Sequence, residues 1–151
     1  MRFMALADDA PTVFLDTSAL LAVFDESDQW HERATNYWKT DIIQSLPRPR
    51  VVLTDFIIDE AATRIRRDVS HQKAVEAVNL LLEMKRRGAF EILAIDEVRF
   101  NAAWKIFVQY SDQDFSFTDC TSFVVCEELK VTRAFAFDSH FQTYRITTAP
   151  L

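Results

Sequence analysis

The sequence predicts an α/β fold with a mainly parallel central sheet. Short apolar runs alternate with longer segments of helical periodicity, an order typical of parallel strands whose connecting helices cover both faces of the sheet. Hydrophobic residues make up 49% of the 151 residues and include 13 Phe, which is enough for one substantial core. We therefore expect one domain at residues 11–151, preceded by a flexible leader at residues 1–10.

The first third of the chain predicts one strand and two helices. The apolar run at residues 11–16 is a buried strand, and Thr17 or Ser18 can cap a short helix at residues 19–24. A second helix is expected at residues 28–46, because apolar side chains recur there every three or four positions. These side chains are Trp30, Ala34, Tyr37, Trp38 and Ile42.

Proline, serine and glycine mark the boundaries of the middle elements. Pro47 and Pro49 stop the second helix. The elements that follow are a strand at residues 51–54 and helices at residues 55–67 and 71–87. Ser70 caps the last of these helices, and Gly88 closes it.

The last third continues the alternation of strands and helices. Residues 90–95 are a third strand, and Asp96 caps a helix that runs to about residue 110. The helix at residues 116–129 has no charged side chain from Cys120 to Cys126, so we expect it to be buried on most sides. The remaining strands are expected at residues 135–137 and, at an edge of the sheet, residues 144–147.

The composition excludes several classes of protein. Gly88 is the only glycine, so a glycine-rich phosphate or dinucleotide loop cannot form. The net charge of −6 argues against a nucleic-acid binder that relies on a basic surface, although not against an enzyme that holds a phosphodiester through metal ions and a few arginines. Cys120 and Cys126 lie within one expected helix, which favours reduced thiols and a cytoplasmic protein. No apolar run reaches the roughly 18 residues of a membrane span.

Four acidic residues lie where strands give way to turns or helices. Asp16 and Asp138 end expected strands. Glu60 lies on the helix after the second strand, and Asp119 lies in the first turn of a later helix. Ligands of parallel sheets bind at the carboxyl ends of the strands, where these acids would gather. Because crowded carboxylates repel one another and a hard divalent cation relieves the repulsion, the pattern predicts a metal site.

Ordinary structural roles compete with this interpretation. Asp16 and Asp119 could simply stabilise helix N-termini, and Asp138 could be a turn residue. Glu60 shares one helix face with two arginines, which could contact RNA phosphates or form a surface ion pair worth roughly 0.3–0.5 kcal/mol. These arginines are Arg64 and Arg67. Structural or solvated roles are expected for the scattered histidines His31, His71 and His140.

Together, the four acidic segments resemble those of the PIN-domain ribonucleases, in particular the VapC toxins of bacterial toxin–antitoxin pairs. The resemblance covers residues 12–141, and its most specific parts are Leu-Asp-Thr-Ser-Ala-Leu at 15–20 and Phe-Thr-Asp-Cys-Thr-Ser-Phe at 117–123. The segments around Glu60 and Asp138 complete the series in the same order. The chain departs from the family in its longer leader and in the absence of a glycine after the last motif.

The resemblance implies a three-layer α/β/α sandwich and Mg²⁺- or Mn²⁺-dependent cleavage of RNA. The catalytic and metal-binding acids of the family fall on Asp16, Glu60, Asp119 and Asp138. Ser18 and Thr118 fall where the family has small hydroxyl residues that hold carboxylates or waters in place. The resemblance also implies a small antitoxin partner and a homodimer.

Two other functions remain open. The chain could be an RNA-processing PIN nuclease that works without an antitoxin, and composition does not separate this from a toxin. It could also be a catalytically silent PIN-like binding module, against which the presence of all four acids argues. A phosphatase of the haloacid dehalogenase type would need a second aspartate where the chain has Ser18, so the sequence argues against it.

Overall fold

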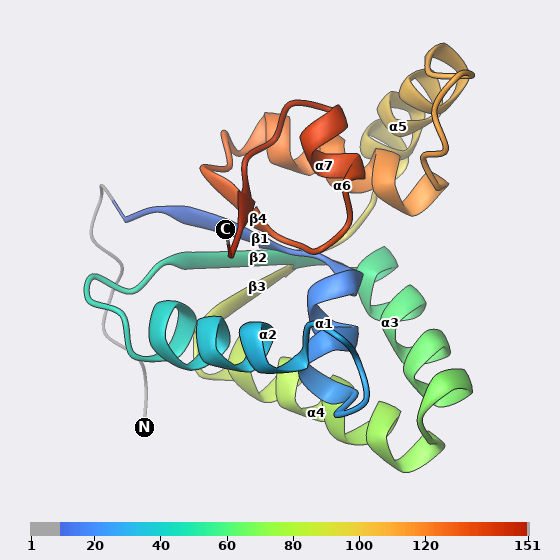
Figure 1. Ribbon diagram of the computed structural model, residues 1–151. Coiled ribbons are helices and arrows are strands. Elements are labelled where there is room, and N and C mark those ends of the chain that lie inside the picture. The colour runs from blue at the N-terminus through green and yellow to red at the C-terminus, as the bar shows by residue number, and fades with distance from the viewer. Residues whose placement is uncertain (1–9, 151) are drawn as a thin grey trace.

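The computed structural model describes residues 10–150, so the expected leader lies almost wholly outside the described residues. The described strands are β1 (Thr12–Leu15), β2 (Arg50–Thr54), β3 (Phe90–Leu93), β4 (Arg133–Phe135) and β5 (Thr148–Ala149). They form one sheet in the order β3-β2-β1-β4-β5, and every neighbouring pair is parallel (Figure 1). The first strand is therefore central, and the expected parallel sheet is confirmed.

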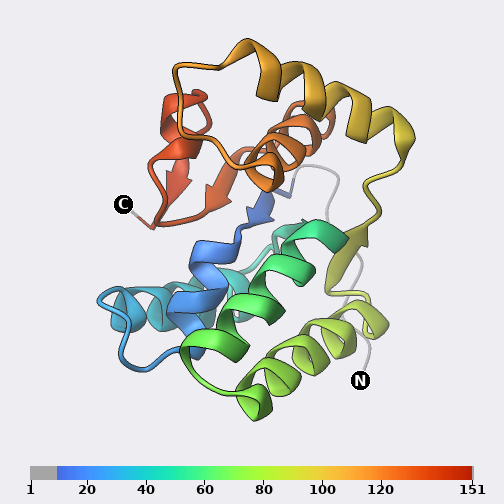
Figure 2. The same ribbon diagram turned by 90° about the vertical axis from the view of Figure 1, so that its right-hand side faces the viewer.

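Helices cover both faces of this sheet. They are α1 (Thr17–Phe24), α2 (His31–Tyr37), the π-helix η1 (Trp38–Ile43), α3 (Asp55–Asp68), α4 (His71–Arg86), α5 (Glu97–Gln109), α6 (Phe117–Glu128) and α7 (His140–Thr143). Figure 1 shows α1, α2 and α4 on one face, and α6 and α7 on the other. Figure 2 shows α3 beside α1 and α4, and α3 also contacts α6. The molecule is thus the three-layer sandwich that the resemblance implied.

Large apolar side chains fill both interfaces between the sheet and its helices. The largest that are completely buried are Phe14, Phe123, Phe135 and Phe141. Cys120 and Cys126 are buried free thiols, as expected. No helix among residues 10–150 is long and apolar enough to cross a membrane.

The cap residues predicted from the sequence are confirmed at the starts of α4 and α5 and wrong at the start of α1. Ser70 and Asp96 accept hydrogen bonds from backbone N–H groups in the first turns of α4 and α5, as expected. The cap of α1, however, is Asp16 rather than Thr17 or Ser18. The carboxylate of Asp16 accepts the N–H of Ser18 at 3.0 Å, so the helix begins two residues earlier than expected.

The expected helix at residues 28–46 was wrong at both ends and in its geometry. The carboxylate of Asp28 accepts the N–H of Trp30 at 2.7 Å, and this turn delays the start of α2 to His31. From Trp38 the chain widens into a π-helix, in which the Gln44 N–H donates to the Lys39 carbonyl five residues back. The apolar period remains similar through this change, so periodicity alone could not detect it.

The last two strands were also placed wrongly. Pairing with β1 sets the limits of β4, because Val13 and Leu15 lie opposite Arg133 and Phe135. Residues 140–143 form α7, whereas β5 lies beyond the expected strand at 144–147. The Tyr144 ring stacks on Phe123 of α6, with ring centroids 4.3 Å apart, so it covers a helix instead of joining the sheet.

Candidate active site

The first acid of the site, Asp16, sits between the central strand and α1. Its Oδ2 accepts the backbone N–H of Ser18 at 3.0 Å and the Ser18 hydroxyl at 2.6 Å. Only 4% of the residue is exposed, and this burial raises the pKa of Asp16 to about 7 from 3.8. The two hydrogen bonds from Ser18 oppose the rise, whereas repulsion from Asp119 and Asp138 adds to it. The electrostatics thus couple three of the four acids.

Ser18 connects Asp16 to the segment that carries Asp138. While its hydroxyl donates to Asp16, the Ser18 Oγ also accepts the backbone N–H of Phe137 at 3.0 Å. Phe137 directly precedes Asp138. Ser18 thus contacts both the Asp16 carboxylate and the backbone that leads to Asp138, while its functional role stays a prediction.

Asp119 takes part in a reciprocal cap at the start of α6. The Asp119 N–H donates to the Ser116 hydroxyl at 2.9 Å, and the Asp119 Oδ2 accepts the Ser116 N–H at 3.0 Å. Burial raises the pKa of Asp119, repulsion from Asp138 adds to the rise, and the bond from Ser116 opposes it. Asp119 therefore does stabilise the start of α6, but its carboxylate also makes a contact outside this helix.

His140 joins Asp119 to Asp138. Its Nδ1 lies 2.8 Å from the Asp119 Oδ2 and 3.1 Å from the Asp138 Oδ1. The Asp138 Oδ1 also accepts the backbone N–H of His140 at 2.7 Å, which turns the imidazole back over the acids. Sequence reasoning missed this residue. The available signal was an aspartate two residues before a histidine at the start of a helix, where such a turn is common.

These groups fit a divalent cation. Asp119, Asp138 and His140 each offer one ligand atom, and the three atoms lie within 4.8 Å of one another. Carboxylate oxygens and one imidazole nitrogen form a donor set that suits Mg²⁺, Mn²⁺ and other first-row divalent metals. A cation there would also oppose the repulsion from Asp119 and Asp138, which adds to the effect of burial on the pKa of Asp16.

The structure does not place Glu60 and Thr118 in direct contact with these acids. Glu60 is half-buried on α3, on the flank of the face that Ile57 and Ala61 bury. Because α3 packs against α1 and α6, Glu60 is carried by a helix next to the site. The Thr118 carbonyl accepts the hydroxyls of Thr121 and Ser122, within α6. The roles assigned to Glu60 and Thr118 stay predictions.

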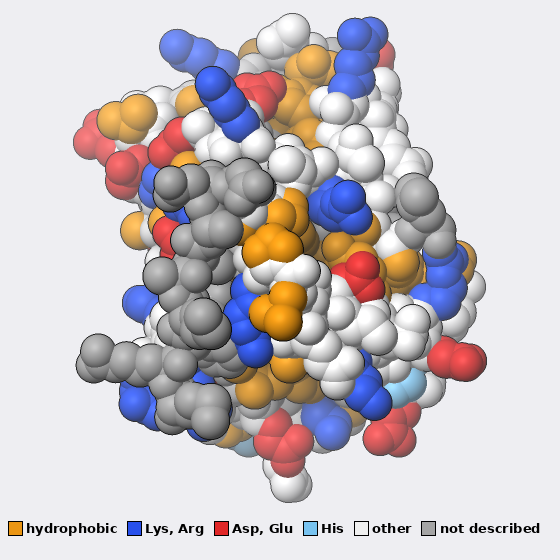
Figure 3. Space-filling model, turned by 90° about the vertical axis from the view of Figure 1, so that its left-hand side faces the viewer, with side chains coloured by type: hydrophobic (Ala, Val, Ile, Leu, Met, Phe, Trp, Pro, Cys, Tyr) orange, Lys and Arg blue, Asp and Glu red, His pale blue; other side chains and the backbone are white. Residues whose placement is uncertain are grey.

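The two candidate phosphate contacts differ in their surroundings. Arg67 is largely exposed and its guanidinium binds Asp68 through two hydrogen bonds, of 2.7 and 3.0 Å. Arg64 is half-buried, one turn after Glu60. Glu60 and Arg64 are both described, and the structure shows no ion pair between them. Figure 3 shows no single basic surface on the face it views, where Lys and Arg side chains are interspersed with acidic and apolar ones.

Comparisons with known proteins agree with this geometry. The sequence model described as the PIN domain matches residues 13–146. The 23S rRNA-specific endonuclease VapC20 of Mycobacterium tuberculosis is 29% identical over 130 residues, which cover 85% of this chain and 91% of that protein.

Solved structures with the same fold include VapC20, described as a sarcin–ricin loop cleaving toxin. Its crystal structure has a TM-score of 0.80 and 24% identity, and the match covers 90% of this chain and 97% of that one. The VapBC2 complex of Rickettsia felis bound to promoter DNA gives a TM-score of 0.61 at 6% identity, covering 91% and 97%. FitAcB of Neisseria gonorrhoeae gives 0.61 at 16% identity, covering 92% and 97%.

Proposed function

Because the chain belongs to the PIN domain family, we propose that it is a metal-dependent endoribonuclease and the toxin of a type II toxin–antitoxin pair. The observation that carries this proposal is the convergence of Asp119, Asp138 and His140 beside Asp16, whose raised pKa reflects burial and the other two acids. This is the arrangement expected of a nuclease that positions a phosphodiester with a divalent cation. A silent binding module would have no need of buried, mutually repelling acids.

Asp16 and Asp119 are assigned as the central ligands of Mg²⁺ or Mn²⁺, and Asp138 and Glu60 complete the site directly or through water. When bound, the cation supplies charge stabilisation at the phosphate and activates water for attack. Ser18 keeps Asp16 oriented through its 2.6 Å hydrogen bond. His140 holds Asp119 and Asp138 together, and its ring nitrogen is a further candidate ligand.

The first RNA to test is ribosomal. VapC20 is named for its action on 23S rRNA and is 29% identical to this chain over 130 residues. Because the net charge is −6, the protein is expected to bind RNA through a few local contacts with the RNA backbone and not through a broadly basic surface. Arg64 and Arg67 remain the candidate phosphate contacts on α3.

A small cytoplasmic antitoxin and a second toxin copy are the proposed protein partners. Solved structures of the same fold include VapBC and FitAB complexes bound to DNA fragments. On this chain, α5 exposes an apolar face in which the exposed fractions are 43% for Phe100, 52% for Trp104 and 39% for Phe107. These rings pack around Phe117, at the start of the helix that carries Asp119. An exposed aromatic cluster of this kind supports a protein interface.

Expression tests separate a toxin from a nuclease that needs no antitoxin. The wild-type chain expressed alone should arrest growth, and the Asp119→Asn variant should not. The protein produced from its native operon should copurify with a small inhibitory partner. The toxin role would be contradicted if cells that express the wild-type chain grew as fast as cells that express the Asp119→Asn variant, and if no protein copurified.

A further inference from the structure

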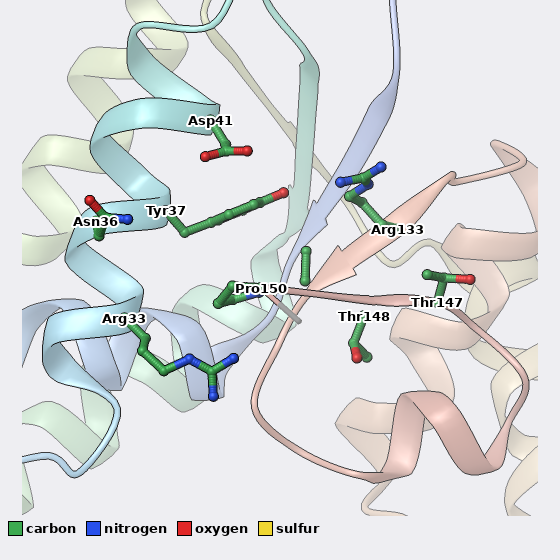
Figure 4. Close-up of a pocket in the computed structure, with 9 residues that line it drawn as sticks. Arg33, Asn36, Tyr37, Asp41, Arg133, Thr147, Thr148 and Pro150 are labelled. Atoms are coloured by element: carbon green, nitrogen blue, oxygen red, sulfur yellow. The ribbon is translucent and has the colours of Figure 1, made fainter.

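A groove leads away from Asp138 between α2 and the edge of the sheet formed by β4 and β5. Beside Asp138 lies a cavity of about 340 Å³, lined also by Trp30, Phe137 and Arg33. A second cavity, of about 450 Å³, continues past Arg33 to Arg133. The two cavities share Arg33, Thr148 and Pro150, so they adjoin and are together called the groove, and Figure 4 shows its second part.

Two matching rows of side chains build this groove. On β4 and the segment after it, Arg133, Phe135 and Phe137 alternate onto one face. Trp30, which directly precedes α2, and Arg33 and Tyr37 on α2 follow one face at three- and four-residue spacing. The rows meet in pairs, since Trp30 stacks on Phe137 and Tyr37 contacts Phe135 edge-on. Arg133 also lies near Tyr37, where its charge opposes the rise in the pKa of Tyr37 that burial causes.

The aromatic stack fixes a guanidinium close to the active site. The Trp30 and Phe137 rings are nearly parallel, at 8°, with centroids 5.4 Å apart. The Arg33 Cζ lies 5.4 Å from the centroid of the Trp30 ring. A guanidinium held over an aromatic face is restricted in position, and the planar guanidinium group matches the geometry of a phosphate. Arg33 is therefore anchored at the junction of the two cavities, one of which Asp138 lines.

We propose that this groove binds the RNA backbone on one side of the cleaved bond, with Arg33 and Arg133 as its phosphate contacts. The inference rests on the proposed ribonuclease function and adds a binding site to it. An anionic strand is favoured as the occupant because the groove starts at a catalytic acid and has guanidinium groups at its junction and on its β4 wall. In Figure 4, Arg33 and Arg133 project from opposite walls, and Asp41 lies on η1, at the end of the pocket away from Arg33.

The test measures binding of a fluorescein-labelled oligouridine by anisotropy, as a function of salt. All arms carry Asp119→Asn and contain Mg²⁺, so that cleavage does not consume the probe. Arg33→Ala and Arg133→Gln should each raise Kd about tenfold, the effect of losing one hydrogen bond to a charged group. Each should also lower the slope of log K against log salt by about 0.7, the value for one single-strand phosphate contact. Arg133→Gln removes the charge but keeps a polar side chain beside Tyr37.

Two further variants sharpen the test. Asp41→Asn removes the acidic group of the second cavity and should tighten binding. Arg86→Ala removes an exposed arginine that binds Glu83 on α4, and should change neither Kd nor slope. Wild-type Kd and slope in both Arg33→Ala and Arg133→Gln would overturn the inference. So would loss of a copurifying protein in these variants with RNA binding unchanged, because the groove would then serve a protein.

The outcome is distinguishable from failure of the proposed function. If the chain with Asp119 intact cleaves RNA but the groove variants bind it normally, only the groove assignment is wrong. If the intact chain cleaves no RNA, the proposed function is wrong, and the anisotropy measurement still decides whether the groove binds a nucleic-acid strand.

Discussion

Ser18 and Phe137, which lie 119 residues apart in the sequence, are joined by a hydrogen bond of 3.0 Å from the Phe137 N–H to the Ser18 hydroxyl. The same hydroxyl donates to Asp16, so a single side chain fixes one acid of the site and the segment that leads to another. The β1–α1 turn and the segment after β4 are thereby held in one arrangement.

Ser18→Ala should separate these two segments. We expect a roughly tenfold or larger loss of RNA cleavage, the usual cost of removing a group that orients a metal ligand. Unfolding free energy in urea should fall by roughly 1–3 kcal/mol, because the hydroxyl makes two hydrogen bonds, one to Asp16 and one from the Phe137 N–H. The matched control is Ser27→Ala, whose hydroxyl donates to Asp25 at 2.6 Å in the same local geometry but on the surface. Equal effects of the two substitutions on cleavage would contradict the role of Ser18.

The stability of the metal-free protein should fall as the pH rises from about 4 to about 7. Because burial raises the pKa of Asp16 to about 7 from 3.8, the folded state retains a proton that the unfolded chain releases. The stabilisation from this group is complete below the unfolded pKa and is lost as the pH passes the folded pKa. Its size is at most roughly 4 kcal/mol.

Asp16→Asn should flatten this part of the profile, measured by urea unfolding in EDTA. Asp112→Asn changes an exposed carboxylate in the segment after α5 and should keep the wild-type slope. A wild-type slope in Asp16→Asn would mean that Asp16 ionises normally in the folded protein.

Divalent cations should stabilise the folded protein. A cation that binds only the folded state adds about 2.7 kcal/mol at a hundredfold excess over its Kd. We expect Mn²⁺ to raise the melting temperature relative to EDTA. The rise should be larger at about pH 7.5 than at about pH 5.5, because protons compete with the metal for the ligands at the lower pH. Asp138→Asn, which alters one of the clustered ligands, should reduce the rise. Identical melting temperatures with saturating Mn²⁺ and with EDTA would exclude a metal site.

Arg64 and Arg67 should contribute unequally to RNA binding. Arg67 is already engaged by Asp68, so Arg67→Ala should weaken binding less than Arg64→Ala. The double variant should lower the slope of log K against log salt, by about 0.7 for each phosphate that the protein no longer binds. The measurement is anisotropy of a labelled RNA, with Arg86→Ala as the surface control. Wild-type affinity and slope in the double variant would assign both arginines to the solvated surface.

The sequence was sufficient for features that depend on neighbours along the chain. The alternation of strands and helices predicted the parallel sheet, and the caps at Ser70, Asp96 and Ser116 follow from side chains that bond within one helical turn. Asp16 and Asp138 could be proposed from the sequence because they follow expected strands, and strand ends place side chains at one edge of a sheet, whatever the packing of the helices.

Features that depend on packing were missed. The imidazole of His140 reaches Asp119 only because Asp138 turns the backbone, and α7 forms where the sequence predicted no helix. The π-helix after Tyr37 keeps an apolar pattern like that of an α-helix. Tyrosine is common in strands, but Tyr144 covers α6 because its ring stacks on Phe123 there.

The most direct test of the proposed function is the cleavage of a labelled ribosomal RNA hairpin by the wild type and by the Asp16→Asn and Asp119→Asn variants, with Mn²⁺ and with EDTA. We predict that the wild type cleaves only with Mn²⁺, and that each variant is slower by at least about a hundredfold while its circular dichroism stays native. Either variant cleaving at the wild-type rate with Mn²⁺, or wild-type cleavage that continues in EDTA, would contradict a metal site built on these two acids.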